Sequence, residues 1–269
     1  MVIAPARKWS PINIRELWTY RDLLLILAGR DVKLRYKQTA LGVVWVVLQP
    51  LIAALLFALI FGKFAQMPSD GQPYVLFVFC GLLPWTFFSG ALQRAGGSLI
   101  ADSRLITKVY FPRILIPIAS TLAVSVDLAV SLLVLVAMMI FYHVTPTWRL
   151  ALLPAFVVLT AVGASGVSLW LSAVSVKYRD FVHALPFIIQ IWLFASPVAY
   201  AASMIPLRYR GVYSINPIVG YVEGFRWAVL GKSTLTVQMV GLATVITIIT
   251  WLGGAVYFRR VERGFADVI

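Results

Sequence analysis

Four cations lie within eight residues of the chain: Arg30, Lys33, Arg35 and Lys37. Asp31 is the one acid among them, and residues 38–62 that follow carry no charge. Arginine binds phosphate through its planar guanidinium fork, and lysine adds a mobile point charge. The cluster could therefore capture an anionic headgroup. The alternative is that these side chains anchor the adjoining apolar run by reaching back to the membrane surface.

Motifs for covalent or metal chemistry are missing from the sequence. It contains no Cys/His cluster, no H-E-x-x-H and no G-x-S-x-G, and its one cysteine, Cys80, lies inside an apolar run. "GKST" at 231–234 resembles the end of a phosphate loop, but Arg226 stands where that motif needs glycine, so we interpret it as chance. We expect no metal site and no cofactor in this chain.

Three residues inside apolar runs need particular surroundings. The amide of Gln49 needs a partner and Pro50 frees a backbone carbonyl, so both should face protein or a water-filled path; a kink satisfied by a neighbouring helix is the alternative. Asp127 is the only carboxylate within an expected span, so it must be neutral, paired or near water. We favour a structural hydrogen-bonding role for Asp127 over proton transfer, because no second titratable group lies near mid-depth.

The composition places these residues in a membrane protein. Of 269 residues, 61% are hydrophobic and 12% are charged, about half the charged fraction of a soluble domain. The net charge of +13 lies between apolar runs rather than on an exposed helix, which argues against nucleic acid. We predict one all-α transmembrane domain over 1–269 with six spans, at about 39–62, 73–93, 114–142, 150–175, 181–200 and 234–258.

The loops between these spans predict the orientation. Seventeen of the 23 Lys and Arg residues lie in the N-terminal arm (1–37), in the loops 94–113 and 177–180, and in the tail 259–269. The alternate loops hold the other six. Because cytoplasmic loops are enriched in Lys and Arg, both termini should be cytoplasmic.

One expected helix does not cross the membrane. The segment 12–27 mixes charged residues with apolar residues at helical spacing, which predicts an amphipathic helix in the cytoplasmic interface. The pattern is imperfect, because Arg21 falls on the apolar stripe.

A second non-spanning segment lies on the outer side. In it, Asn216 is a candidate N-cap, Pro217 suits the first helical turn, and an apolar run then continues to Gly231. We predict short helices over about 204–231 that dip back into the outer leaflet between the last two spans.

Six motifs in order resemble one protein family: "RDVKLRYKQTALGVVWVVLQPL" (30–51), "GLLPWTFFSGAL" (81–92), "LITKVYFPRILIPIAS" (105–120), "VKYRDFVHALPFIIQIWLFASPVAY" (176–200), "NPIVGYVEGFRWAVLG" (216–231) and "FRRVERGFADVI" (258–269). They resemble ABC-2-type permeases, the membrane subunits of O-antigen, capsule and teichoic-acid exporters. The resemblance implies a homodimer with two copies of a separate ATPase subunit, which would bind ATP and Mg²⁺. It also implies a polysaccharide cargo on a polyprenyl (pyro)phosphate lipid, and that the membrane is a bacterial plasma membrane.

Within that family, the resemblance gives residues of this chain their expected roles. The cationic cluster would meet the lipid pyrophosphate. The ATPase would contact the interface helix and a short helix at about 98–107, through Leu99, Asp102, Arg104, Leu105 and Lys108. A solvated loop is the alternative for this second segment. The segment 204–231 would form an outer gate that includes Asn216, Glu223 and Arg226, and Glu223 and Arg226 are spaced to form a local pair.

Aromatic and amide side chains could line the path of the glycan. His183, Phe187, Gln190 and Phe194 are spaced by four, three and four residues, which places them on one helical face. Sugar rings stack on aromatic faces and leave their hydroxyls for amides. Trp45, Gln49, Trp85 and Phe88 are further candidates, and packing against other helices is the alternative for each residue.

Three rival functions remain open at this point: an ABC-2 permease for a small lipid or drug, a carrier driven by an ion gradient through Asp127, and a membrane-embedded glycolipid enzyme. The missing catalytic motifs argue against the enzyme.

Overall fold

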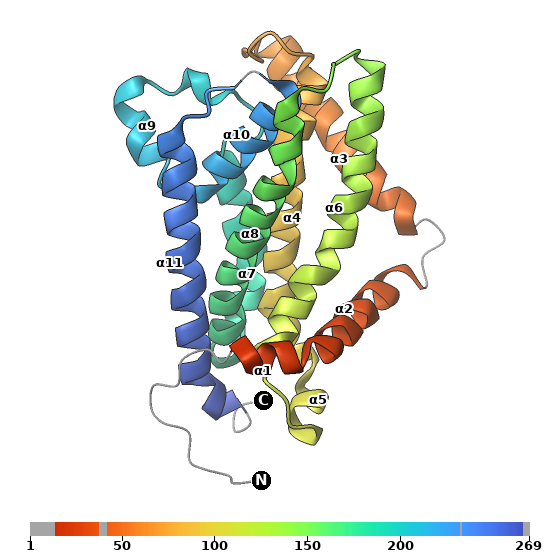
Figure 1. Cartoon of the computed structure of the whole chain (residues 1–269), viewed down its shortest axis with the longest axis vertical. Coiled ribbons are helices and arrows are strands. Elements are labelled where there is room, and N and C mark those ends of the chain that lie inside the picture. The colour runs from red at the N-terminus through yellow and green to blue at the C-terminus, as the bar shows by residue number, and fades with distance from the viewer. Residues whose placement is uncertain (1–13, 38–41, 232, 266–269) are drawn as a thin grey trace.

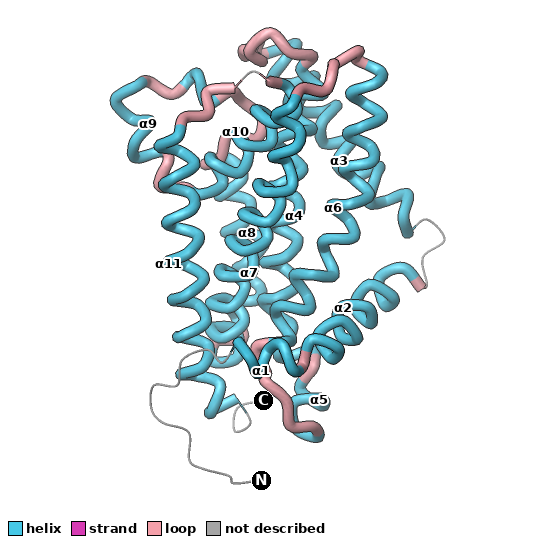
Figure 2. Tube along the Cα trace, viewed as in Figure 1, coloured by secondary structure: helices cyan, strands magenta, loops and turns pink. Residues whose placement is uncertain are grey.

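The chain forms a bundle of long helices (Figure 1). The computed structural model describes residues 14–37, 42–231 and 233–265, in which helices and loops but no strands occur (Figure 2). The elements are α1 (Ile14–Thr19), α2 (Arg21–Tyr36), α3 (Gly42–Phe57), η1 (Ala58–Phe64), α4 (Tyr74–Ala101), α5 (Ser103–Lys108), α6 (Leu115–Phe141), η2 (Trp148–Leu152), α7 (Leu153–Lys177), α8 (Asp180–Phe194), η3 (Ala202–Met204), α9 (Leu207–Tyr213), α10 (Pro217–Leu230), α11 (Val237–Val261) and η4 (Glu262–Gly264). The all-α prediction is confirmed for this part of the chain. The first 13 residues of the predicted arm and the start of the first span, 39–41, lie outside the described residues.

Five helical segments of the described chain are long and apolar enough to cross a membrane: Val44–Phe64, Tyr74–Ala101, Leu115–Phe141, Trp148–Lys177 and Val237–Val261. They match five of the six predicted spans. The span predicted over 181–200 is shorter than expected, because α8 ends at Phe194 after 15 residues. At 1.5 Å per residue this is about 22 Å, less than the hydrocarbon core of about 30 Å. Turns carry the chain onward from Ala195 to Tyr200.

Helix α4 forms the centre of the bundle. In its most apolar window 78% of residues are buried, against 17% for the first span. It packs against α6 on one side and α7 and α10 on the others. The prediction ended this span at residue 93, but the helix runs on to Ala101. A single arginine at 94 did not end it, because the apolar pattern of the following turns continues into a second cluster of buried side chains.

Helices α7 and α11 approach closely where two glycines meet. A Cβ atom on Gly166 would lie 2.8 Å from the Cα atom of Trp251, and one on Gly254 would lie 2.6 Å from the carbonyl oxygen of Gly166. Small residues at a helix crossing let two backbones touch, which is a main source of stability between helices in lipid. These two positions therefore fix how α7 and α11 cross.

The predicted interface helix is two helices. Helix α1 ends at Thr19, and α2 begins at Arg21 and continues to Tyr36, nine residues beyond the predicted end at Leu27. The break explains the imperfect pattern, because it takes Arg21 off the stripe and leaves it exposed beside Asp22. Helix α2 packs against α6 and thereby carries most of the cationic cluster to the bundle.

The two ends of the bundle carry different elements. Helices α1 and α5 and the last turns of α11 lie at one end, and α9 and α10 lie at the other (Figure 1). The prediction for α10 is confirmed at both of its ends: Asn216 accepts a hydrogen bond from the backbone N–H of Ile218, Pro217 begins the helix, and Gly231 ends it with a left-handed φ of 69°. Glycine adopts that conformation without steric cost, which gives the first residue of "GKST" a structural role.

Candidate functional site

A cavity of about 550 Å³ lies between α3, α4 and α6. Two arginines and one carboxylate supply its charge: Arg35, Arg94 and Asp127. Its neutral polar lining consists of Gln49, Thr86, Ser89, Gln93 and Ser131. Pro50 and Trp85 add apolar walls. Gln49 and Pro50, which we expected to face protein or a polar path, both line this cavity.

Asp127 is paired, as its place within a span requires. Arg35 donates from Nη1 to Oδ2 of Asp127, and the Tyr36 hydroxyl donates to Oδ1. Burial and the bond to Asp127 raise the pKa of Tyr36 to about 12, so its hydroxyl stays protonated. Both partners come from α2, which the sequence alone could not indicate because more than ninety residues separate them from Asp127.

Arg94 is the residue of this cavity that the sequence analysis missed. Within residues 14–37, 42–231 and 233–265 it makes no hydrogen bond or ion pair, although it is partly buried. A signal was present, because Thr86, Ser89, Gly90, Gln93 and Arg94 recur at intervals that place them on one face of a helix. Arg94 was instead assigned to the loop after the span.

The four cations of the cluster do not act as one site. Arg35 points into the cavity, whereas Arg30 donates to Asp102 at 2.6 Å and to Asp31 at 2.8 Å. These two carboxylates, Asp102 first, raise the pKa of Arg30. Lys33 and Lys37 are exposed along a groove on the far side of α2 that Leu25, Ile26 and Leu34 also line. Arg30 also lines this groove. One helix thus turns Arg35 into the cavity and places the other three cations along the groove.

The expected glycan-path residues of α8 share one face. His183, Phe187, Gln190 and Phe194 are all exposed in the single chain, with Phe187 68% and Phe194 62% exposed. Phe88 does not join them, because it is 1% exposed and packs edge-on against Trp192 with ring centroids 5.1 Å apart. The alternative of packing against other helices is therefore the correct one for Phe88.

Trp45 and Trp85, the other two aromatic candidates, lie in different surroundings. Trp45 is 54% exposed on α3 and is absent from the cavity wall, whereas Trp85 is largely buried and lines the cavity. Only Trp85 therefore shares a space with Gln49.

The expected ATPase contact is divided between exposed and buried residues. Arg104 and Lys108 are exposed on α5, and Leu105 is partly buried. Leu99 was expected to lodge in a partner, but it belongs to α4, is 1% exposed and packs inside this chain. Asp102 was expected to face water or a partner, but its carboxylate turns to Arg30. Both expectations were wrong because α4 is longer than predicted, which keeps Leu99 and Asp102 within the bundle.

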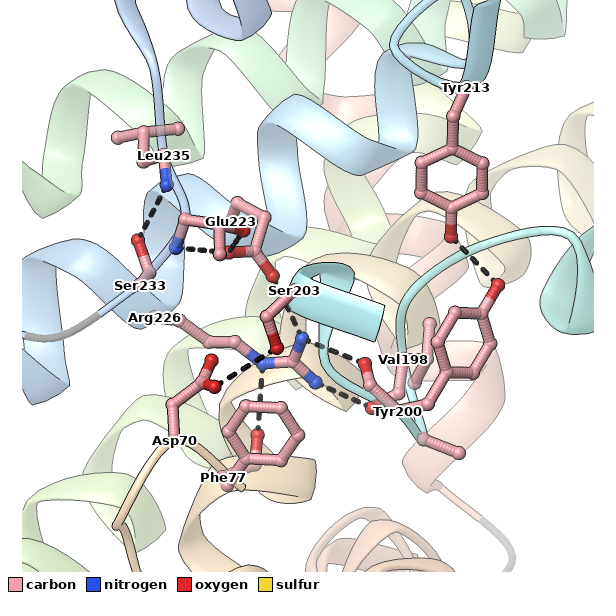
Figure 3. Close-up of polar contacts among 12 residues, drawn as sticks. Asp70, Phe77, Val198, Tyr200, Ser203, Tyr213, Glu223, Arg226, Ser233 and Leu235 are labelled. Atoms are coloured by element: carbon pink, nitrogen blue, oxygen red, sulfur yellow. Dashed lines mark hydrogen bonds and ion pairs between the residues drawn. The ribbon is translucent and has the colours of Figure 1, made fainter. Parts of the chain in front are cut away.

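A buried ion pair holds the opposite end together (Figure 3). The expected pair is confirmed: Nη1 of Arg226 lies 3.0 Å from Oε1 of Glu223, and both side chains are at most 2% exposed. Arg226 also donates to the carbonyl oxygens of Val198 at 2.8 Å and of Phe77 and Tyr200 at 3.3 Å. Glu223 accepts from the backbone N–H and the hydroxyl of Thr234. The pair thus joins α10 to three other segments.

Asn216 makes a second polar connection at this end. Its side-chain oxygen accepts from the indole N–H of Trp192 at 3.0 Å, and its amide donates to Ser196 Oγ at 2.9 Å. The residue that caps α10 therefore also holds the C-terminal end of α8. All three expected outer-gate residues are structural contacts between segments of this chain.

The fold defines a multi-pass helical membrane protein with a polar cavity between its spans. Among the residues that the structure describes, no group of three or more His, Cys, Asp or Glu side chains could hold a metal ion. The sequence profile of the ABC-2 type transporter family matches residues 22–230. The chain belongs to this family.

Relatives extend this similarity over nearly the whole chain. The chain is 30% identical over 261 residues to the O-antigen export system permease protein RfbA of Myxococcus xanthus, with 95% of this chain and 98% of the relative covered. It is 27% identical over 252 residues to an RfbA of Klebsiella pneumoniae, with 92% and 95% covered. It is 24% identical over 238 residues to the polysialic acid transport protein KpsM of Escherichia coli, with 87% and 91% covered. The resemblance inferred from the six motifs is confirmed.

Proposed function

We propose that this chain is the membrane subunit of an ABC exporter that moves a lipid-linked polysaccharide out of the bacterial cytoplasm. O antigen is the first candidate cargo, and capsule or teichoic acid are the others. The observation that carries the proposal is the match to an O-antigen export permease along 95% of this chain and 98% of the relative.

The chain provides the path, and a separate subunit provides the energy. Two copies of this chain enclose the path, and two ATPase copies bind ATP and Mg²⁺ at the cytoplasmic face. The chain itself is a permease and not an enzyme. In support, Arg104 and Lys108 are exposed on α5, at the same end of the bundle as α1 and the start of α2. Closure of the ATPase pair would push on these elements.

The face of α8 suits the passage of a sugar polymer between two copies. His183, Phe187, Gln190 and Phe194 are exposed in the single chain and fill no part of its core. A second copy facing them would convert an exposed stripe into the wall of a path. Aromatic rings stack on sugar C–H faces and the amide meets hydroxyls, so the surface holds a polymer without trapping it.

The outer end closes the path. Helices α9 and α10, within the segment 204–231, form the outer gate, and the buried pair of Glu223 and Arg226 makes α10 the stiff part of it. Both termini lie in the cytoplasm, which places α5 beside the ATPase and α9 outside. The excess of Lys and Arg in the loops at the α5 end supports this orientation.

Removal of this chain from its host tests the proposal. The lipid-linked polymer should accumulate inside the cell and disappear from the surface, and the wild-type chain should restore export. It should fail to do so when the partner ATPase carries a substitution that abolishes ATP hydrolysis. Transport of the polymer by the purified chain alone, driven by an ion gradient, would contradict the proposal. So would normal polymer export with retention of a small lipid or drug.

A further inference from the structure

The cavity between α3, α4 and α6 carries more positive than negative charge. Its charged side chains are Arg35, Arg94 and Asp127, and Asp127 is bound to Arg35. Arg94 therefore presents a guanidinium to this space without a carboxylate of its own among the described residues. Asp127 and Asp31 attract Arg94, but each of these carboxylates is already bound to another arginine, Asp127 to Arg35 and Asp31 to Arg30. A partly buried cation whose nearest carboxylates are shared in this way is costly in a low-dielectric surrounding. An anion bound in the cavity would balance the positive charge of Arg94.

We propose that this cavity binds the phosphate groups of the lipid-linked substrate, with Arg94 as a permanent ligand and Arg35 as a second ligand that Asp127 holds until phosphate arrives. This inference rests on the proposed function for the identity of the substrate. It differs from the surface cluster expected from sequence, because only Arg35 of that cluster takes part.

The chemistry of the lining fits a phosphate ester or diphosphate. Two guanidinium groups can each donate two parallel hydrogen bonds to phosphate oxygens. Thr86 and Ser89 add hydroxyls, and Gln49 and Gln93 add amides. A volume of about 550 Å³ lies within the range of about 300–1,000 Å³ that small-molecule sites occupy. The apolar face of α3 outside the cavity leaves room for the lipid chain in the membrane.

Asp127 serves as the internal competitor for Arg35. A carboxylate and a phosphate bind the same guanidinium fork, so only one of them can hold Arg35 fully. When phosphate takes Arg35, the hydroxyl of Tyr36 still donates to Asp127. The carboxylate is then not left without a partner, which lowers the cost of the exchange.

The other cations of α2 cannot replace this pair. Arg30 is held by two carboxylates, Asp31 and Asp102. Lys33 and Lys37 are exposed to the groove on the far side of the helix. Their positive charge attracts anions to the surface, whereas Arg35 and Arg94 meet them inside the bundle.

Binding of a sugar-free polyprenyl diphosphate to the purified permease, in nanodiscs of zwitterionic lipid, tests the inference. Loss of charge-assisted bonds in Arg94→Gln should weaken binding by about tenfold or more, and Arg94→Lys should weaken it less. Asp127→Asn frees Arg35, so it should tighten binding. Lys63→Gln, which removes an exposed cation outside the cavity, should leave the affinity unchanged.

Three further probes separate the sources of phosphate. The affinity for a polyprenyl alcohol of the same length should be unchanged by Arg94→Gln. Binding of inorganic diphosphate reports on free phosphate, and binding to phosphatidylglycerol vesicles reports on ordinary lipid headgroups. Equal loss of alcohol and diphosphate binding, or no effect of Arg94→Gln, overturns the inference; so does weaker binding in Asp127→Asn. If diphosphate binding by the purified permease depends on Arg94 but the host cell exports no polysaccharide, the inferred site stands and the proposed function is overturned.

Discussion

Arg226 and Arg94 differ in how their charge is compensated, and Arg226 is fully buried whereas Arg94 is partly buried. Arg226 is enclosed by Glu223 and three carbonyl oxygens, so all of its charge is compensated within the chain. Arg94 makes no hydrogen bond or ion pair among the described residues, and the carboxylates that attract it, Asp127 and Asp31, are bound to Arg35 and Arg30. An arginine with its own carboxylate supports the fold, whereas one that only shares carboxylates can bind a ligand. The sequence predicted the first kind from an i, i+3 spacing. It could not predict the second, because the absence of a partner is a property of the tertiary structure.

The pair of Glu223 and Arg226 yields a prediction on stability. Glu223→Gln removes the carboxylate and leaves a fully buried guanidinium uncompensated, which should cost about 3–5 kcal/mol of unfolding free energy. The midpoint of thermal unfolding in detergent should fall accordingly. Asp22→Asn, which removes an exposed acid, is the matched control and should change the free energy of unfolding by no more than about 0.5 kcal/mol. Equal midpoints for both variants would show that the pair does not support the fold.

For the helices, the predicted and observed ends agree in some elements and differ in others. Windows with no charge located α7 and α11 to within a few residues, and a window interrupted by Asp127 located α6, because charges rarely enter a span. The same reasoning failed at α4, where Arg94 was taken as the end of the helix although the core continues to Leu99. It also missed the break between α1 and α2 at Tyr20. A helix continues past a single charged residue when the residues after that charge pack into the core.

The crossing of α7 and α11 gives a prediction for the element scale. Gly254→Val places side-chain atoms against the backbone of α7, where a Cβ atom alone would lie 2.6 Å from the oxygen of Gly166. The helices must separate, so the unfolding midpoint and the yield of folded protein should both fall. Gly241→Val lies on the same helix, where a Cβ atom meets nothing within 4 Å, and should behave like the wild type. An unaffected Gly254→Val variant would mean that the two helices can cross at another distance.

For the whole molecule, the arrangement of its ends is the informative feature. The first and last described helices, α1 and η4, lie at one end (Figure 1). Five helical segments of the described chain have the length of a full span, and α8 is shorter. The sequence located these five segments from their apolar runs. It could not predict that α8 ends at Phe194, because the turns from Ala195 to Tyr200 are held by tertiary contacts with Asn216 and Arg226.

Reporter fusions test the orientation. A reporter that is active only outside the cytoplasm should be active when fused after Arg210 in α9 and inactive when fused after Arg179, between α7 and α8. The reason is the excess of cations in the loops at the Arg179 end. A reporter active only in the cytoplasm, fused at the same positions, is the control and should give the reverse pattern. Activity of the first reporter at Arg179 alone would invert the topology.

Helix α2 is fastened at two points to different parts of the molecule. Arg30 binds Asp102, just before α5, and Arg35 binds Asp127 in the middle of α6. Five helical residues separate the two arginines, about 7.5 Å along the axis. Because a short helix is stiff over this distance, α2 should move as a rigid body. A displacement of α2 at the Arg30–Asp102 ion pair would therefore also displace the guanidinium of Arg35 against Asp127. A force applied beside α5 would therefore be transmitted through α2 to Asp127 in the interior of the bundle.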